Sequence, residues 1–279
     1  MSSINTNASA MTALQTLSAT NKNLATTQGR IATGMRVAEA SDNAAYWSIA
    51  TTMRSDNKAN SVVQDALGLG AAKVDTAYAG MKSAIEVVDK IKEKVLLAKA
   101  TDSATERAKI QGEIATYQAQ LKDNIAGASY AGSNLLKNGT AATDPTKLSV
   151  ITSYNRGAGN AVTTGTIDIA FTATRLINSD PTAATANKGI LDKVSTVSQR
   201  SILNLDVTKL GADATATPPL LVVPGATEAD QFNNMLTDIE SALSSMSTAA
   251  AELGASKARI DLQKDFVSKL SDSIDRGVG

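Results

Sequence analysis

Few residues of this chain are able to perform acid–base, nucleophilic or metal chemistry. Its 279 residues include no histidine and no cysteine, which removes the commonest general base, the commonest metal ligand and the thiolate nucleophile. The carboxylates of Asp168, Asp180 and Asp192 stand apart from one another, outside any catalytic motif, and we interpret them as surface charges. We therefore predict a protein that is not an enzyme, with no catalytic residue, no cofactor and no metal site.

The composition also narrows the classes of partner. The 27 basic and 27 acidic side chains give a formal net charge of zero, so there is no electrostatic reason to bind nucleic acid or an anionic membrane surface. No apolar run approaches the roughly 20 residues of a transmembrane helix. The first residues have neither the basic nor the apolar region of a secretory signal peptide. We expect no nucleic-acid partner and no membrane insertion, and any export must use another route.

The elements that must carry the function are long amphipathic helices, and the first fifty residues organise them. Apolar residues recur there in steps of four and three, which is the heptad pattern of a helix that packs against partner helices. This pattern predicts a helix over residues 4–33, with Gly34 as its C-terminal stop. The positions of the stripe are Ala10, Leu14, Leu17, Asn21, Leu24, Gln28, Ile31 and Met35.

A break at 35–41 separates this helix from the next one. Ser41 or Asp42 is a suitable N-cap, and the residues after it read as helix through the polar interval at 54–60. Trp47, the single tryptophan, lies in its first turns. We interpret Trp47 as a plug of the core, with a surface anchor for another subunit as the alternative.

Three further helices complete the helical pattern. The second helix ends near Ala100, a Ser103–Glu106 capping box starts the third, which ends near 126–127, and the last helix begins at 227. Because only two residues separate the second and third helices, we expect an antiparallel helical hairpin. The predicted stripes are Val74, Tyr78, Met81, Ile85, Val88, Ile91 and Val95; then Ile110, Ile114, Tyr117, Leu121 and Ile125; then Phe232, Leu236, Ile239, Leu243, Met246, Ala250, Leu253, Ile260, Val267 and Ile274.

Residues 140–225 have a different character. All five prolines lie there, and alternating segments predict strands at 148–152, 166–171 and 202–207. Asn138-Gly139 is a hairpin signal just before this region. The predicted fold class is mainly α with a smaller β-rich part: a long antiparallel helical rod with an inserted β-containing outer domain. The expected divisions are 1–41, 42–139, 140–225 and 226–279.

Several segments of the chain resemble the signatures of bacterial flagellins, in a style closer to alphaproteobacterial than to enteric members. The resemblance covers residues 1–139 and 226–279. It is carried by Ser-Ile-Asn-Thr-Asn at 3–7, Arg-Ile-Ala-Thr-Gly at 30–34, Ala-Ser-Asp-Asn-Ala-Ala at 40–45, Ser-Ile-Ala at 48–50, Ser-Asn-Leu-Leu at 133–136, Leu-Gly-Ala-Ser-Lys-Ala-Arg-Ile at 253–260 and Gln-Lys-Asp-Phe-Val-Ser-Lys-Leu at 263–270.

This resemblance implies a structural subunit that polymerises into the flagellar filament for swimming motility. It also implies secretion through the flagellar type III export apparatus, with a chaperone, and contact with other flagellin subunits, the filament cap and hook-associated proteins. Residues 1–41 would form the inner layer, 42–139 and 226–279 the shell, and 140–225 the exposed domain. The implied interface residues are Leu14, Leu17, Leu24, Ile31 and Met35 in the inner layer, and Arg30, Gly34, Asp42 and Trp47 at the turn and shell.

Two departures from the family pattern lead to expectations. Flagellins usually continue past the segment matching 275–279 with a further helix that partners the first one, so here we expect the first helix to be frayed, disordered or paired with another molecule. The motif that activates the vertebrate Toll-like flagellin receptor matches 89–97. There Lys90 and Glu93 fit, but Lys94 stands where the motif is apolar, and burying an unpaired lysine is costly. We therefore expect weak activation or none.

Two other functions remain open at this point. A hook–filament junction protein shares the same ends, and a surface adhesin could use the same rod. An adhesin that binds sugars needs an aromatic-lined site, and residues 140–225 offer only Tyr154 and Phe171. We therefore favour the self-assembling filament subunit.

Overall fold

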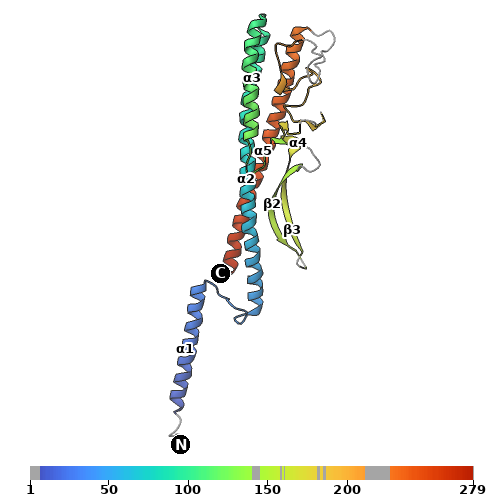
Figure 1. Cartoon of the computed structure of the whole chain (residues 1–279). Coiled ribbons are helices and arrows are strands. Elements are labelled where there is room, and N and C mark those ends of the chain that lie inside the picture. Colours follow the sequence, from blue (N-terminus) through green and yellow to red (C-terminus); the bar gives the residue numbers. More distant parts are fainter. Residues whose placement is uncertain are drawn as a thin grey trace. The chain divides into compact units, whose positions relative to one another are not determined.

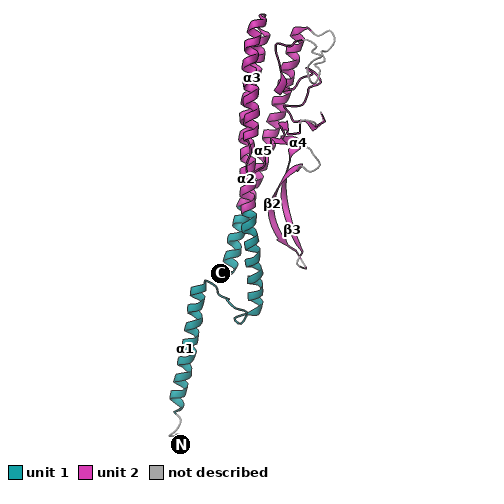
Figure 2. Cartoon of the chain, in the orientation of Figure 1, with its two compact units in different colours: residues 1–64, 265–279 teal, residues 65–264 magenta. Residues whose placement is uncertain are grey.

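A computed structural model describes residues 7–139, 145–157, 159, 161–180, 183–184, 187–210 and 227–278. Long helices dominate these residues, and a small region contains the strands (Figure 1). This is the predicted fold class. The chain separates into two compact units, Met1–Gln64 with Asp265–Gly279, and Asp65–Lys264 (Figure 2).

Helix α1 spans Ala8–Thr33 and has a cap at each end. The Asn7 side chain accepts hydrogen bonds from the backbone N–H groups of Ser9 and Ala10, which satisfies donors that a helix start leaves free. Gly34 ends the helix at φ 66°, a left-handed conformation that costs glycine little. The predicted C-terminal stop is confirmed. The predicted start at residue 4 lies outside the described residues.

Helix α2 spans Ala44–Lys99, and its cap differs from the prediction. The Asn43 side chain, and not that of Ser41 or Asp42, accepts from Tyr46 N at 3.2 Å. Asp42 instead stabilises the preceding turn, where its carboxylate accepts from Ala38 N at 3.2 Å and from Glu39 N at 3.3 Å. The polar interval at 54–60 is helical, as predicted.

The buried stripe of α2 keeps the heptad period but shifts by one residue at two of the predicted positions. Ala77 and Ala84 are buried, whereas Tyr78 is 41% exposed and Ile85 is half-buried. The prediction chose the larger apolar residue at these positions, but the smaller alanine is the buried one. A small residue lets the helices approach closely, and its larger neighbour then lies at the edge of the contact. The buried apolar side chains of α2 are Val63, Leu67, Val74, Ala77, Met81, Ala84, Val87, Val88, Ile91, Val95 and Ala98.

Helix α5, Glu228–Val278, shows the same shift. Met235, Ala242 and Ala249 are buried where Leu236, Leu243 and Ala250 were predicted, and these three are only half-buried. Within Asp65–Lys264, α5 runs antiparallel to α2. Lys99 Nζ donates to Asn233 Oδ1 at 2.6 Å, and the ion pairs Lys92–Glu240 and Lys257–Asp75 follow in reverse order along α5.

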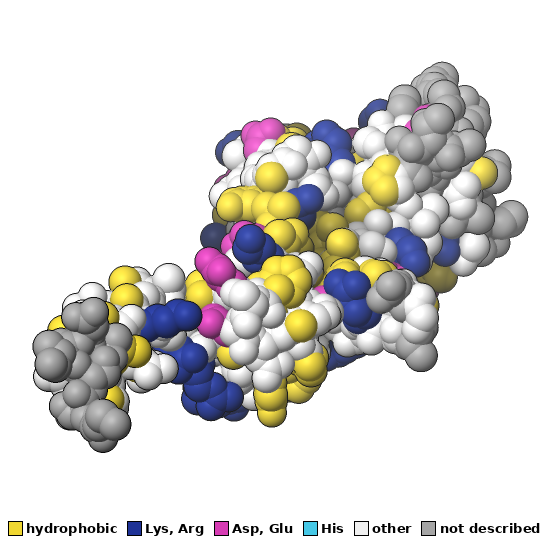
Figure 3. Space-filling model, turned by 90° about the horizontal axis from the view of Figure 1, so that it is seen from below, with side chains coloured by type: hydrophobic (Ala, Val, Ile, Leu, Met, Phe, Trp, Pro, Cys, Tyr) yellow, Lys and Arg dark blue, Asp and Glu magenta, His cyan; other side chains and the backbone are white. Residues whose placement is uncertain are grey.

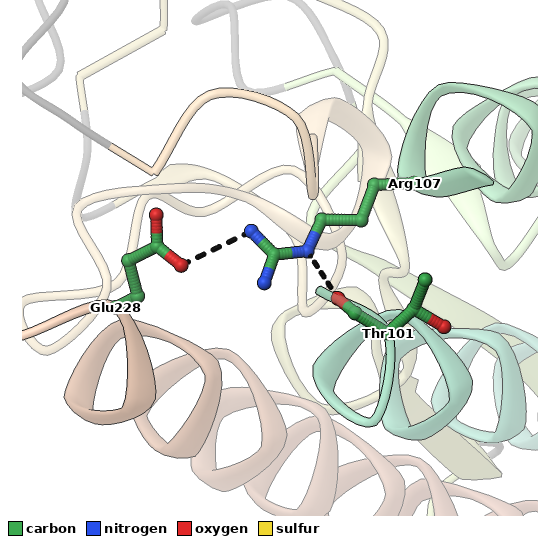
Figure 4. A network of polar contacts seen from close by, with 3 residues as sticks. All are labelled: Thr101, Arg107 and Glu228. Carbon is green, nitrogen blue, oxygen red and sulfur yellow. Dashed lines mark hydrogen bonds and ion pairs between the residues drawn. The ribbon is translucent and has the colours of Figure 1, made fainter. Parts of the chain in front are cut away.

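Helix α3, Ala104–Gly127, forms the predicted antiparallel hairpin with α2. Ser103 Oγ accepts from Glu106 N at 3.4 Å, as the capping box requires. Figure 4 shows how the turn is joined to α5: Arg107 donates from Nε to Thr101 O at 2.7 Å and from Nη1 to Glu228 Oε2 at 3.1 Å. The same guanidinium lies 5.4 Å from the ring centroid of Phe232, a cation–π distance.

The strands form two separate pairs. β2, Lys147–Arg156, pairs antiparallel with β3, Val162–Ala170, which confirms two predicted strands with longer bounds. β1, Lys137–Asn138, pairs in parallel with β4, Ile177–Asn178, so the predicted Asn-Gly hairpin is wrong. A four-residue helix, α4 (Phe171–Thr174), follows β3. Phe171, predicted as the end of a strand, begins this helix.

The third predicted strand is also wrong, because its residues form a strap over the helices. Residues Ile202–Asn204 make a 3₁₀ turn, η3, and the apolar side chains of 202, 203, 205 and 207 are buried. Buried Gln118 of α3 donates to Ile202 O and Leu205 O, both at 3.0 Å. The Gln118 amide satisfies these two carbonyls, so they need no hydrogen bonds from a neighbouring strand.

Candidate assembly surface

Helix α1 presents its apolar stripe entirely to solvent. None of its residues is buried, and Leu14, Leu17, Leu24 and Ile31 are between 55% and 77% exposed. Isolated helices of this length are marginal in water. The stripe therefore has the geometry of one side of a helix–helix interface whose partner is another helix.

Threonines of α1 bond to the backbone of their own helix. Thr12, Thr16 and Thr20 each donate from Oγ1 to the backbone carbonyl four residues earlier at 2.9 Å. A hydroxyl used in this way presents its methyl group outward, and such bonds slightly weaken a helix. The side chains of α1 therefore add little to the stability of the isolated helix, and packing against a partner helix would stabilise it more.

The turn after α1 places the other predicted interface residues. Arg30 lies in the last turn of α1, and Gly34 ends the helix in its left-handed conformation. Met35 is half-buried, and its sulfur is contacted by the Arg54 guanidinium of α2. The bonds from Ala38 and Glu39 to Asp42 brace this turn.

Trp47 is not a core plug, which corrects the main interpretation. It is 36% exposed, beside Tyr46 at 58% and Ile49 at 57%. Sequence reasoning missed these two neighbours, although three large apolar side chains within four residues of a polar helix were the available signal. A shallow cavity of about 170 Å³ lies next to them, lined by Arg36, Val37, Tyr46, Ile49, Ala50, Met53, Arg276, Gly277 and Val278.

Exposed aromatic side chains beside arginines have the composition of protein–protein contact sites. On the face seen in Figure 3, hydrophobic side chains lie exposed beside lysine and arginine side chains. Leu262 and Phe266 of α5 are 70% and 56% exposed. Sequence reasoning missed them because both lie outside the heptad stripe of that helix.

The receptor-motif residues lie on α2, where two of the three contact α3. Lys90 Nζ lies 5.9 Å from the ring centroid of Tyr117, and Lys94 forms an ion pair with Glu113. The hydrogen bond to Glu113 raises the pKa of the Lys94 ammonium above its ordinary value. Lys94 is therefore charged at physiological pH. The third residue, Glu93, is exposed.

The carboxylates considered first have structural roles where their contacts are described. Asp192 accepts from Asn178 N at 3.1 Å and from Gly189 N at 2.5 Å, so it braces β4 and is not a plain surface charge. Asp168 accepts from Lys147 Nζ at 2.6 Å, which holds the pKa of its carboxyl below the usual range. Within the described ranges, no cluster of three metal-ligating side chains occurs. No helix in that part of the chain has the length and apolar character to span a bilayer.

Sequence comparisons with known proteins agree on one family. A family model described as the bacterial flagellin N-terminal helical region matches residues 4–141. Flagellin C of Rhizobium meliloti (strain 1021) is 44% identical over 284 residues, covering 100% of this chain and 86% of that protein. A flagellin of Brucella melitensis is 46% identical over 279 residues, covering 100% and 84%. The crystal structure of Bacillus cereus flagellin matches at 12% identity with a TM-score of 0.44, covering 74% of this chain and 88% of that one.

Proposed function

The chain belongs to the bacterial flagellin family, and from this premise we infer that it is a structural subunit that polymerises into the flagellar filament. The observation that carries this function is similarity to named flagellins along the whole chain. A second one supports it: α1 has no buried residue and exposes an apolar stripe. The relatives' names do not favour the hook–filament junction protein or the adhesin.

We propose that the parts of the chain divide the work as the family pattern implies. Residues 1–41 form the inner layer, 42–139 and 226–279 the shell, and 140–225 the outer domain. The interface residues proposed for the inner layer are Leu14, Leu17, Leu24, Ile31 and Met35, and those at the turn and shell are Arg30, Gly34, Asp42 and Trp47. The exposure of the stripe and of Trp47 supports this assignment.

We further propose a non-enzymatic protein that leaves the cell through the flagellar export apparatus with a chaperone. Its proposed location is the extracellular flagellum. There it meets other flagellin subunits, the filament cap and hook-associated proteins, without nucleic acid, cofactor, metal or membrane insertion.

Assembly of the purified chain tests the function directly. We expect it to sediment as filaments, visible by negative-stain microscopy, when filament seeds are added. Seeds supply the partner surface that α1 lacks in the monomer, so seeded samples should assemble faster than unseeded ones. A chain that remains soluble with seeds, at concentrations where a relative polymerises, contradicts the proposed function.

Activation of the Toll-like flagellin receptor should be weak or absent. Binding to the receptor would bury Lys94, which forms an ion pair with Glu113. Removing water from a charged side chain is unfavourable. Lys94→Leu should raise the response of reporter cells, because it supplies the apolar residue of the family motif. Lys82→Leu, at an exposed position of the same helix, should not. A wild-type response at the potency of an enteric flagellin would refute this expectation.

A further inference from the structure

A cleft of about 380 Å³ lies between α5 and the chain that precedes and follows β4. Its lining residues come from 172–175, 188–196 and 202 and from α5, and all of them belong to the unit Asp65–Lys264. This volume is within the range of small-molecule binding sites. The lining side chains that carry a charge or a hydroxyl are Thr172, Arg175, Lys188, Lys193, Ser195, Thr196, Asp238, Ser241 and Ser245.

Two lysines of the cleft stand on a braced turn. Lys193 N donates to Gly189 O at 3.1 Å, and Gly189 N donates to Asp192 Oδ1 at 2.5 Å. Lys188 is half-buried and Lys193 is exposed, and both line the cleft. The backbone that carries the two ammonium groups is therefore held in place before any ligand arrives, which lowers the entropic cost of binding.

Positive charge outweighs negative charge in this lining. Arg175 is 6% exposed, and its guanidinium is fixed by donation from Nε to Asn138 Oδ1 at 2.5 Å. The one carboxylate of the lining, Asp238, already accepts one hydrogen bond on each oxygen, from Ser195 Oγ at 2.5 Å and from Ser198 N at 3.1 Å. Because a concave site concentrates the field of its charges, three cations beside one carboxylate favour an anion there.

Several donors of the cleft are also free to bind a ligand. Within the part of the chain that the structure describes, the Lys193 ammonium and the Thr196 and Ser241 hydroxyls make no hydrogen bond or ion pair. By contrast, Ser245 Oγ donates to the carbonyl of residue 241 at 2.9 Å. An ammonium group donates and never accepts, so the free groups match a ligand that is rich in acceptor oxygens.

We propose that this cleft binds a small molecule that carries a phosphate or sulfate ester on a hydroxylated body. The oxyanion lies between the ammonium groups of Lys188 and Lys193, because lysine is a point charge that suits tetrahedral oxyanions. Thr196 and Ser241 bond to the hydroxyls of the body, since a hydroxyl both donates and accepts. The site uses charge and hydroxyls and not aromatic stacking, so the scarcity of aromatic side chains in 140–225 does not argue against it.

This inference goes beyond the proposed filament, because the whole cleft lies within one copy of the chain. Most of its lining residues belong to 140–225, the region proposed as the outer domain, where a dissolved molecule can reach them in the polymer. Ligand binding and polymerisation can therefore be measured separately.

Titration of the soluble chain, followed by the chemical shifts of its amides, tests the site. Inorganic phosphate and sulfate are the minimal probes, and glucose 6-phosphate and glucose 6-sulfate add a hydroxylated body. We expect all four anions, but not uncharged glucose, to shift the amides of 188–196 and 241–245, and added salt to weaken the binding. Each ester should bind more tightly than its inorganic anion, and the tighter ester identifies which of the two groups the site prefers.

Substitutions in the cleft should weaken binding of the esters. Lys193→Gln should cost about tenfold or more in affinity, because it removes a charged donor, whereas Lys193→Arg should keep most of the affinity. The matched control is Lys137→Gln, which removes the same charge at an exposed position of β1 outside the lining. Ser241→Ala should cost about fivefold, and Ser244→Ala, at an exposed position of α5 outside the lining, should cost nothing.

Two results would overturn the site. The first is that none of the four anions shifts these amides. The second is that Lys137→Gln weakens binding as much as Lys193→Gln, which would show that the esters respond only to net charge. Neither result bears on the seeded polymerisation assay, so a failure of this site is distinguishable from a failure of the filament function.

Discussion

Replacing Leu17 and Leu24 of α1 with glutamine will prevent polymerisation while leaving the stability of the monomer unchanged. Both side chains are more than half exposed in the monomer, so their loss removes no internal contact, and glutamine keeps a high helix propensity. In the polymer each leucine would be buried, which contributes about 1.5–3 kcal/mol. Losing two weakens the contact by about 3–6 kcal/mol, which raises the concentration needed for assembly roughly 100- to 10,000-fold.

Sedimentation over a concentration series gives the critical concentration, and urea unfolding of the soluble chain gives the stability. The matched control is Ala19→Gln with Thr26→Gln, at exposed positions on the opposite side of the heptad, which should assemble like the wild type. Equal critical concentrations for the stripe and control variants would show that α1 does not pack through this stripe. A fall in the monomer's urea midpoint would show that the stripe already has an intramolecular partner.

The helices were predictable because their information is local. Gly34 ended α1 through its own left-handed conformation, and Ser103 began α3 by accepting a hydrogen bond from the backbone N–H of Glu106, three residues later. The period of the seam was also readable. The occupants of its alternate positions were not, since Ala77 and Ala84 are chosen by the distance to a partner helix, which no local pattern records.

The strap at 202–207 was mispredicted for a non-local reason. Its alternating apolar residues are typical of a strand, but its carbonyls are satisfied by Gln118, which lies 84 and 87 residues away along the chain. The parallel pairing of β1 with β4 is also non-local, because it joins Lys137 to Ile177. The candidate site was predicted only in part: the α1 stripe was visible in the sequence, but the exposure of Trp47, beside exposed Tyr46 and Ile49, was not predicted.

Gly189→Ala should destabilise the outer region by about 3 kcal/mol, because overpacking against backbone has no cheap relief. A Cβ at this buried position would lie 2.6 Å from Ile177 N and closer still to the carbonyl group of Leu176. The chain is held there on both sides: Ile190 N donates to Arg175 O at 3.1 Å, and Leu191 N donates to Leu176 O at 2.9 Å. A shift of Gly189 must therefore break the bonds that join this segment to the residues just before β4.

Hydrogen exchange at the amides of 190 and 191 measures this local loss, and far-UV circular dichroism should show the long helices retained. Gly112→Ala is the matched control, since nothing lies within 4 Å of its Cβ position in α3. That substitution should stabilise the chain by about 0.5–1 kcal/mol, because alanine favours a helix over glycine. If Gly189→Ala lowers the stability and Gly112→Ala raises it, the close approach of residue 189 to the backbone of Leu176, and not backbone flexibility, is what requires glycine at 189. Unchanged protection in Gly189→Ala would mean that the two segments do not approach this closely in solution.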